Sequence, residues 1–104
     1  MAKKIRGRFY FKKTTNGNLI GEWSNYEDAH IYTEGADAKL PGNENYDGYY
    51  FSTWQENGVP QFAELEIKRD GSKFSMVWRE NETNKFVGEA MLCDNVLIGD
   101  YYQP

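Results

Sequence analysis

Dipeptides with a strong preference for tight turns divide this chain into runs that are rich in aromatic and β-branched residues. They are Asn16-Gly17, Asn57-Gly58, Asp70-Gly71 and Asp94-Asn95. Asn, Asp and Gly readily adopt the left-handed backbone conformation that two-residue β-hairpin turns require. Because such hairpins join antiparallel neighbours, the pattern predicts an all-β, up-and-down meander. We expect eight strands, at residues 4–13, 18–25, 28–34, 47–56, 60–69, 72–80, 85–93 and 96–103.

One segment interrupts the regular spacing of the turns. The stretch from Glu34 to Gly48 contains Pro41, glycines and several acidic residues, so it is expected to be the one long loop. Whether this loop acts as a lid stays open at this point. A chain of 104 residues has room for one modest core, which predicts a single domain over residues 1–104.

Glycines stand inside several strand-like runs, where glycine normally lowers stability. They are Gly7, Gly21, Gly88 and Gly99. A three-residue loop at 15–17 would pair Phe11 with Gly21, and the Asp94-Asn95 turn would pair Gly88 with Tyr101. Inward glycines that are covered by rings permit the sharp coiling of a small barrel. We therefore predict that the eight strands close into a barrel, and an open, strongly bent sheet is the alternative.

Turn geometry also separates an inner from an outer face later in the chain. A turn at Asp70-Gly71 would place Ile67 opposite Phe74 and Leu65 opposite Met76. The last hairpin would in the same way turn Leu92 and Leu97 inward.

The inner face combines small and large side chains. Glycine, alanine and serine form its middle belt, and aromatic rings lie above and below. An eight-stranded barrel of this kind is either packed solid or holds one small ligand. If a cavity exists, its aromatic wall and few hydroxyl groups suit a small, flat or apolar molecule. The candidate ligand-binding residues on this face are Trp23, Tyr50, Ser52, Trp54, Trp78 and Tyr101.

The motif Gly21-Glu22-Trp23-Ser24-Asn25 carries a resemblance to known barrels. Gly-x-Trp on a barrel strand is similar to the signature of the lipocalin and avidin superfamily, and Gly-x-Trp-x-Asn resembles the first strand of avidins. The resemblance implies an eight-stranded, ligand-binding barrel in which Asn25 would contact the ligand. In avidins a hydroxyl is expected four residues later, where this chain has Ala29, and here another strand precedes the motif. The whole chain also resembles small uncharacterised bacterial proteins of lipocalin-like shape, which implies a fold and no activity.

Composition argues against several classes of function. The net charge of −4, with acids and bases interspersed, offers no basic face for nucleic acid and no basic stripe for a membrane. The basic start is not followed by the apolar stretch of a signal peptide, so a cytoplasmic location is expected. With one cysteine, Cys93, and one histidine, His30, we expect no disulfide, no metal site and no cofactor.

The strongest candidate for acid–base chemistry is a pair of acids on the outer face. The last hairpin sets Glu89 opposite Asp100, where two like charges repel. In a closed barrel the first strand brings Arg6 and Arg8 beside them, so an arginine–carboxylate ladder is favoured over a catalytic pair. His30 is expected to be outward and solvated, since no nucleophile motif accompanies it.

These observations favour a non-enzymatic binding module that holds a small apolar or aromatic ligand inside the barrel. A filled barrel that recognises another protein is the alternative, and a small barrel enzyme comes last. The outer face of the 85–103 hairpin is also unusually apolar, which predicts a homodimer through that face. The outward residues there, with one from the second strand, are Ile20, Val87, Met91, Cys93, Val96, Ile98 and Tyr102.

Overall fold

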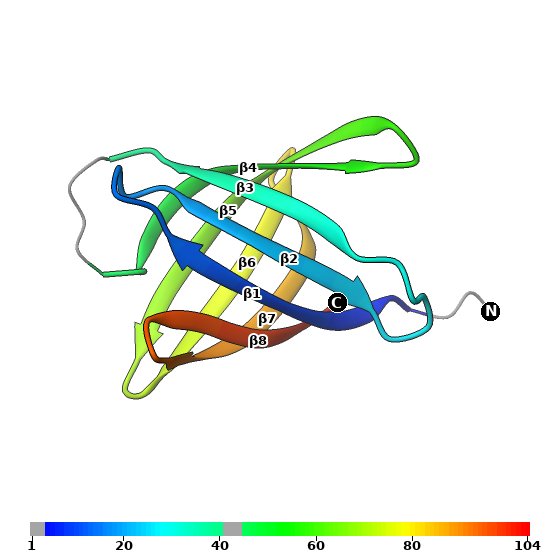
Figure 1. Cartoon of the computed structure of the whole chain (residues 1–104). Coiled ribbons are helices and arrows are strands. Elements are labelled where there is room, and N and C mark those ends of the chain that lie inside the picture. Colours follow the sequence, from blue (N-terminus) through cyan, green and yellow to red (C-terminus); the bar gives the residue numbers. More distant parts are fainter. Residues whose placement is uncertain (1–3, 41–44) are drawn as a thin grey trace.

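Eight antiparallel strands form a closed barrel in sequence order (Figure 1), as the sequence predicts. The computed structural model describes residues 4–40 and 45–104. The first and last strands pair directly, which closes the barrel and rules out the open sheet. The strands are β1 (Arg6–Lys13), β2 (Leu19–Asn25), β3 (Tyr32–Ala38), β4 (Gly48–Glu56), β5 (Val59–Asp70), β6 (Lys73–Glu80), β7 (Thr83–Cys93) and β8 (Val96–Tyr102).

The third strand lies four residues later than predicted. It covers Tyr32–Ala38, so the start of the expected long loop is in fact strand, and the predicted strand at 28–34 was wrong. Acids and glycine in this segment have low β-propensity, so the sequence pattern did not indicate a strand at 35–38. In the structure the strand alternates, since Glu34 and Ala36 are buried while Thr33 and Asp37 are exposed. Residues 41–44 of the expected loop lie outside the described residues.

Most of the predicted turns are confirmed. The Asn57-Gly58 and Asp94-Asn95 turns have positive φ at both residues, and the first hairpin is closed by a loop with Gly17 at φ +83°. As predicted, Phe11 pairs with Gly21. The connection expected between the strands at 72–80 and 85–93 is a two-residue turn, in which Asn81 and Glu82 have φ values of 51° and 65°.

The β5–β6 hairpin differs from its predicted register by two residues. Its turn consists of Gly71 and Ser72, with Asp70 opposite Lys73, so Leu65 faces Trp78 rather than Met76. The predicted pairs Ile67–Phe74 and Leu65–Met76 were therefore wrong. Because side chains alternate with a period of two, a shift of two residues leaves every side chain on its predicted face.

Close strand approach explains the inward glycines. A Cβ atom built on Gly21 would lie 1.9 Å from the carbonyl oxygen of Tyr10, and one on Gly99 would lie 2.0 Å from that of Glu89. Such contacts with backbone atoms cannot be relieved by rotating a side chain. The glycines thus permit the tight coiling of a small barrel, as expected.

Aromatic and aliphatic side chains fill the middle of the barrel. Phe11, Leu65, Met76 and Leu97 are among its most deeply buried residues. Leu92 was predicted to face inward but is 48% exposed. The β6–β7 pairing ends at Lys73 opposite Met91, so Leu92 pairs with Leu97 in β8 but has no partner in β6.

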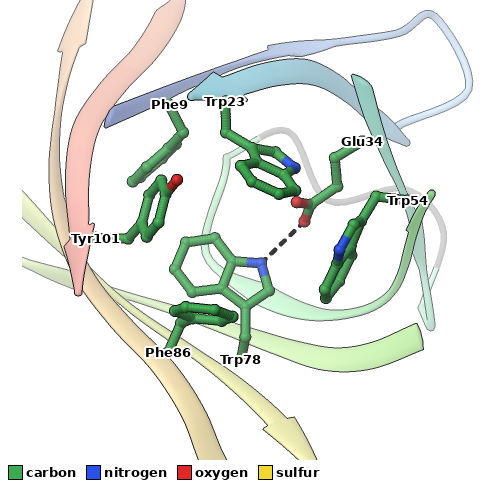
Figure 2. Close-up of a pocket in the computed structure, with 7 residues that line it drawn as sticks. All are labelled: Phe9, Trp23, Glu34, Trp54, Trp78, Phe86 and Tyr101. Atoms are coloured by element: carbon green, nitrogen blue, oxygen red, sulfur yellow. Dashed lines mark hydrogen bonds between the residues drawn. The ribbon is translucent and has the colours of Figure 1, made fainter. Parts of the chain in front are cut away.

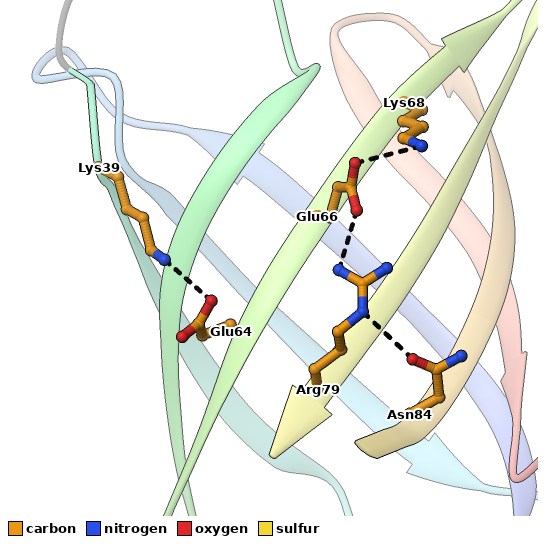
Figure 3. A network of polar contacts seen from close by, with 6 residues as sticks. All are labelled: Lys39, Glu64, Glu66, Lys68, Arg79 and Asn84. Carbon is orange, nitrogen blue, oxygen red and sulfur yellow. Dashed lines mark hydrogen bonds and ion pairs between the residues drawn. The ribbon is translucent and has the colours of Figure 1, made fainter. Parts of the chain in front are cut away.

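Polar side chains on the outer face of β5, β6 and β7 form an ion-pair network (Figure 3). Glu66 accepts a hydrogen bond from Arg79 at 2.9 Å, and Lys68 lies 3.4 Å from the same carboxylate. Arg79 also donates to the side-chain oxygen of Asn84 on β7. The Arg79 guanidinium holds the pKa of Glu66 below its usual value.

Candidate functional site

A small cavity lies inside the barrel among side chains from every strand except β5 (Figure 2). Its volume is about 30 Å³, which is room for one or two water molecules. The wall is almost entirely aromatic, with a single carboxylate. The residues that line it are Phe9, Trp23, Glu34, Trp54, Trp78, Phe86 and Tyr101.

The aromatic side chains of the wall support one another by edge-to-face packing. Trp23 meets Trp54 at 88° and Tyr101 at 88°, and Phe9 meets Trp78 at 83°. Such arrangements are favoured because the positive edge of one ring lies against the negative face of another. Trp23 also stacks on Tyr32, with 4.1 Å between ring centres. The cavity wall is therefore a connected array and not a set of independent side chains.

Glu34 is the unexpected member of this site. Its place in β3 puts it opposite Trp54 on one side and Gly21 on the other. The alternation of β3 turns the side chain inward, and glycine at position 21 adds no side chain to compete with it. Only 4% of Glu34 is exposed.

Two neighbours donate hydrogen bonds to the Glu34 carboxylate. The Ser52 hydroxyl donates to Oε2, and Trp78 Nε1 donates to the same oxygen at 2.9 Å. Burial raises the pKa of Glu34 to about 7, and the two hydrogen bonds oppose that rise. Glu34 is consequently a group whose charge changes near neutral pH.

The indole nitrogen of Trp23 is the second unusual polar atom. It is buried and has no hydrogen-bond partner within the described residues. Figure 2 shows the nitrogen on the edge of the ring that turns toward Glu34. A buried donor of this kind normally finds an acceptor, so the cavity is suited to a polar atom that accepts from Trp23.

The predicted ligand-binding residues fall into three groups. Trp23, Trp54, Trp78 and Tyr101 line the cavity. Two others support the wall: Ser52 donates to Glu34, and Asn25 accepts a hydrogen bond from the Tyr101 hydroxyl at 2.5 Å. Tyr50 is buried but does not line this cavity, and its hydroxyl donates to the Tyr46 carbonyl oxygen at 2.7 Å.

A β-bulge shapes one side of the site. The register between β6 and β7 shifts after Trp78, which pairs with Phe86, while the next residue pairs with Asn84. Lys85 is thereby left without a cross-strand partner in β6. Its amino group lies 5.5 Å from the ring centre of Trp54 and 2.8 Å from the Glu80 carboxylate. The bulge thus places a paired cation next to an aromatic residue of the wall.

The outer-face acids form no arginine ladder of the predicted kind. Glu89 does lie opposite Asp100, and Arg8 lies beside Asp100 on the other side, as expected. Asp100 instead accepts a hydrogen bond from the Tyr26 hydroxyl at 2.8 Å, and the guanidinium of Arg8 lies 5.1 Å from the centre of the Tyr26 ring. Tyr26, which lies between β2 and β3, therefore mediates the contact between the two charges.

The remaining candidates lie on the surface. His30 is exposed, in the connection before β3 rather than in a strand, and packs against Tyr32 with 4.4 Å between ring centres. Cys93 is exposed at the end of β7. Among residues 4–40 and 45–104, no group of three or more His, Cys, Asp or Glu side chains could hold a metal ion.

Comparison with protein-family models found no match, and neither did comparison with curated proteins or with solved structures. In the described part of the chain, no helix is long and apolar enough to span a bilayer.

Proposed function

We infer that this protein is a non-enzymatic binding module, which holds a small ligand with a flat or apolar body in the aromatic cavity. The observation that carries this inference is the unpartnered Trp23 N–H beside a buried carboxylate in an otherwise apolar wall. An apolar pocket with a few convergent polar groups and a shifted pKa is typical of ligand sites.

Packing alone does not account for Glu34. Burial of a carboxyl group and an unpaired N–H in a core opposes folding, and an apolar residue at either position would avoid that penalty. Proteins keep such unfavourable groups mainly at functional sites. The two polar groups lie on the same cavity, which supports a common role in orienting a ligand.

The present cavity is smaller than most ligands, so binding requires movement of part of its wall. Trp23 and its stacking partner Tyr32 are the candidates because both are only partly buried. A rotation of this stacked pair would widen the site while Phe9 and Trp78, which are buried, stay in place.

The avidin-like motif supports the same location for the ligand. Trp23 of that motif lines the cavity, and Asn25 holds Tyr101, which also lines it. A lipocalin-like or avidin-like identity is proposed on this basis together with the barrel. We also propose a cytoplasmic location, which the exposed free thiol of Cys93 favours.

A protein-binding role is the second candidate, because exposed apolar side chains cover part of the outer face. Met91, Ile98 and Tyr102 are each about half exposed on β7 and β8, and Ile20 joins them on β2. A small enzyme is the weakest alternative, since Asp100 is hydrogen-bonded to Tyr26 and His30 is exposed beside Tyr32.

Titration with indole, a flat and neutral probe, tests the proposed function. We expect one molecule to bind per chain and to shift the side-chain N–H resonances of Trp23 and Trp78 in NMR spectra. Trp54→Leu should weaken binding, while Phe62→Leu on the exposed outer face of β5 should leave it unchanged. Resonances that stay in place at saturating indole would contradict the proposal.

A further inference from the structure

The arrangement of the Glu34 carboxylate among indole rings has a chemical meaning beyond a generic apolar pocket. Figure 2 shows the carboxylate between the rings of Trp23, Trp54 and Trp78. Within the described residues, both hydrogen bonds to Glu34 end on Oε2. The other oxygen, Oε1, thus remains for a ligand.

Aromatic faces attract cations through the ring quadrupole, and cages of aromatic side chains are a known means of binding ammonium groups. A carboxylate inside such a cage adds a direct, charge-assisted contact. We propose that the ligand is a small organic cation, a protonated or methylated amine, whose ammonium group lies between Glu34 and the indole rings. This proposal rests on the proposed function and specifies its ligand.

The charges around the cavity fit a cation better than an anion. Glu56 accepts a hydrogen bond from Trp54 Nε1 at 2.8 Å, and Asp28 accepts one from the Tyr32 hydroxyl at 3.4 Å. Lys85 is the basic group near Trp54, and it is already paired with Glu80 at 2.8 Å. Two carboxylates therefore flank the aromatic wall, and the neighbouring ammonium is compensated.

Trp23 adds a second requirement. An ammonium group donates hydrogen bonds or, when fully methylated, makes none, so it cannot satisfy the Trp23 N–H. A hydroxyl or carbonyl oxygen close to the ammonium group could accept from Trp23. The preferred ligand class is thus a compact amine that carries an oxygen, such as an amino alcohol.

Binding of a cation should compete with protonation of Glu34. The pKa of Glu34 without ligand is about 7 because of burial, and a nearby ammonium favours the ionised carboxylate. Among the described residues, Glu56, Asp28 and Lys85 are charged groups near the site. Tyr101, which also lines it, has its pKa raised by burial and by Glu34. Affinity for a permanent cation should therefore fall about tenfold for each pH unit well below 7 and level off above it.

The test compares choline with 3,3-dimethylbutan-1-ol, its uncharged isostere in which carbon replaces nitrogen. At pH 8 we expect choline to bind at least tenfold more tightly, as measured by calorimetry and by the Trp23 and Trp78 resonances. Glu34→Gln should remove this preference while affinity for the isostere stays within about twofold. Glu56→Gln, which removes a charge at the wall but keeps Glu34, should change choline affinity by less than about threefold.

The outcomes separate this proposal from the proposed function. Equal affinity for choline and its isostere, or a choline preference that survives in Glu34→Gln, would overturn the cation proposal and leave ligand binding in place. If indole binds but neither choline nor its isostere does, the cation proposal is overturned in the same way. If indole, choline and the isostere all fail to bind the wild-type protein, both proposals are overturned.

Discussion

At the scale of single residues, Glu34 sets this barrel apart from a simply packed one. Its carboxyl group is buried among aromatic rings and holds two donors on one oxygen. The sequence does not draw attention to it, because an acid followed by glycine suggests a loop. Only the structure reveals the alternating burial of β3 that places Glu34 and Ala36 inside.

Replacing Glu34 by Gln should change how stability depends on pH. The pKa is about 7 in the folded state against an ordinary value of 4.5. Because the folded pKa is raised, the contribution of Glu34 to stability is greatest below pH 4.5 and falls as the pH rises to 7. That loss is on the order of 3 kcal/mol in the wild-type protein, and Glu34→Gln lacks it.

Denaturant unfolding of both proteins at pH 4 and pH 8 measures this effect. The stability of Glu34→Gln relative to wild type should increase by about 3 kcal/mol between the two pH values. Other titrating groups cancel in this difference. Parallel curves for the two proteins would show that Glu34 has an ordinary pKa and is not buried as described.

A glycine pair offers a residue-scale test of the coiling. Gly21→Ala should destabilise the protein by about 1–3 kcal/mol, because its Cβ meets the backbone of Tyr10 at 1.9 Å. Gly35→Ala on β3 is the matched control, since a Cβ there meets nothing within 4 Å. It should be neutral or stabilise by about 0.5–1 kcal/mol. If Gly21→Ala and Gly35→Ala changed the free energy of unfolding equally in chemical denaturation, β1 and β2 would not lie as close together as described.

At the scale of strands and hairpins, sequence predicted more than it did for the site. Left-handed turn residues identified three hairpins and their registers correctly, including the pairing of Phe11 with Gly21. The Asp70-Gly71 turn failed because Gly71 occupies the first turn position rather than the second. The Asn81-Glu82 turn and the bulge after Trp78 carry no strong local signal, so they required the whole structure.

The β5–β6 pair makes a prediction about electrostatics between strands. The Arg79 guanidinium lowers the pKa of Glu66, so their contact should stabilise the protein above the ordinary carboxyl pKa and be lost as the pH falls through the lowered value. Arg79→Ala should reduce the free energy of unfolding by about 1 kcal/mol at pH 7 and by less at pH 3.

Lys68→Ala is the control for this pair. Lys68 contacts the same carboxylate, but its side chain is largely exposed, so its removal should have a smaller effect than removal of Arg79. If both substitutions had the same effect at pH 7, the network in Figure 3 would not depend on Arg79 as described.

At the scale of the whole molecule, the outer face of β7 and β8 exposes several apolar side chains, among them Met91, Ile98 and Tyr102. Val87 pairs with Tyr102 and Met91 with Ile98 across β7 and β8, and the Glu89–Asp100 pair lies between them on the same face. We propose a homodimer through this region, because a two-fold axis would bury it against an identical surface.

Analytical ultracentrifugation at micromolar concentration tests the dimer. We expect a species of twice the 12.1 kDa chain mass, which Ile98→Lys should convert to monomer. Phe62→Lys, at an exposed position on β5, should leave the dimer intact. A wild-type protein that sediments only as a monomer would reject this interface.

The interior site is the central claim, and the most direct test is to observe a ligand inside it. Intermolecular NOEs should be recorded for choline at saturation with the wild-type protein at pH 8. We predict NOEs from the choline methyl groups to ring protons of Trp23, Trp54 and Trp78. NOEs confined to outer-face residues such as Ile98 and Tyr102, or the absence of NOEs to these rings from choline and also from indole, would contradict it.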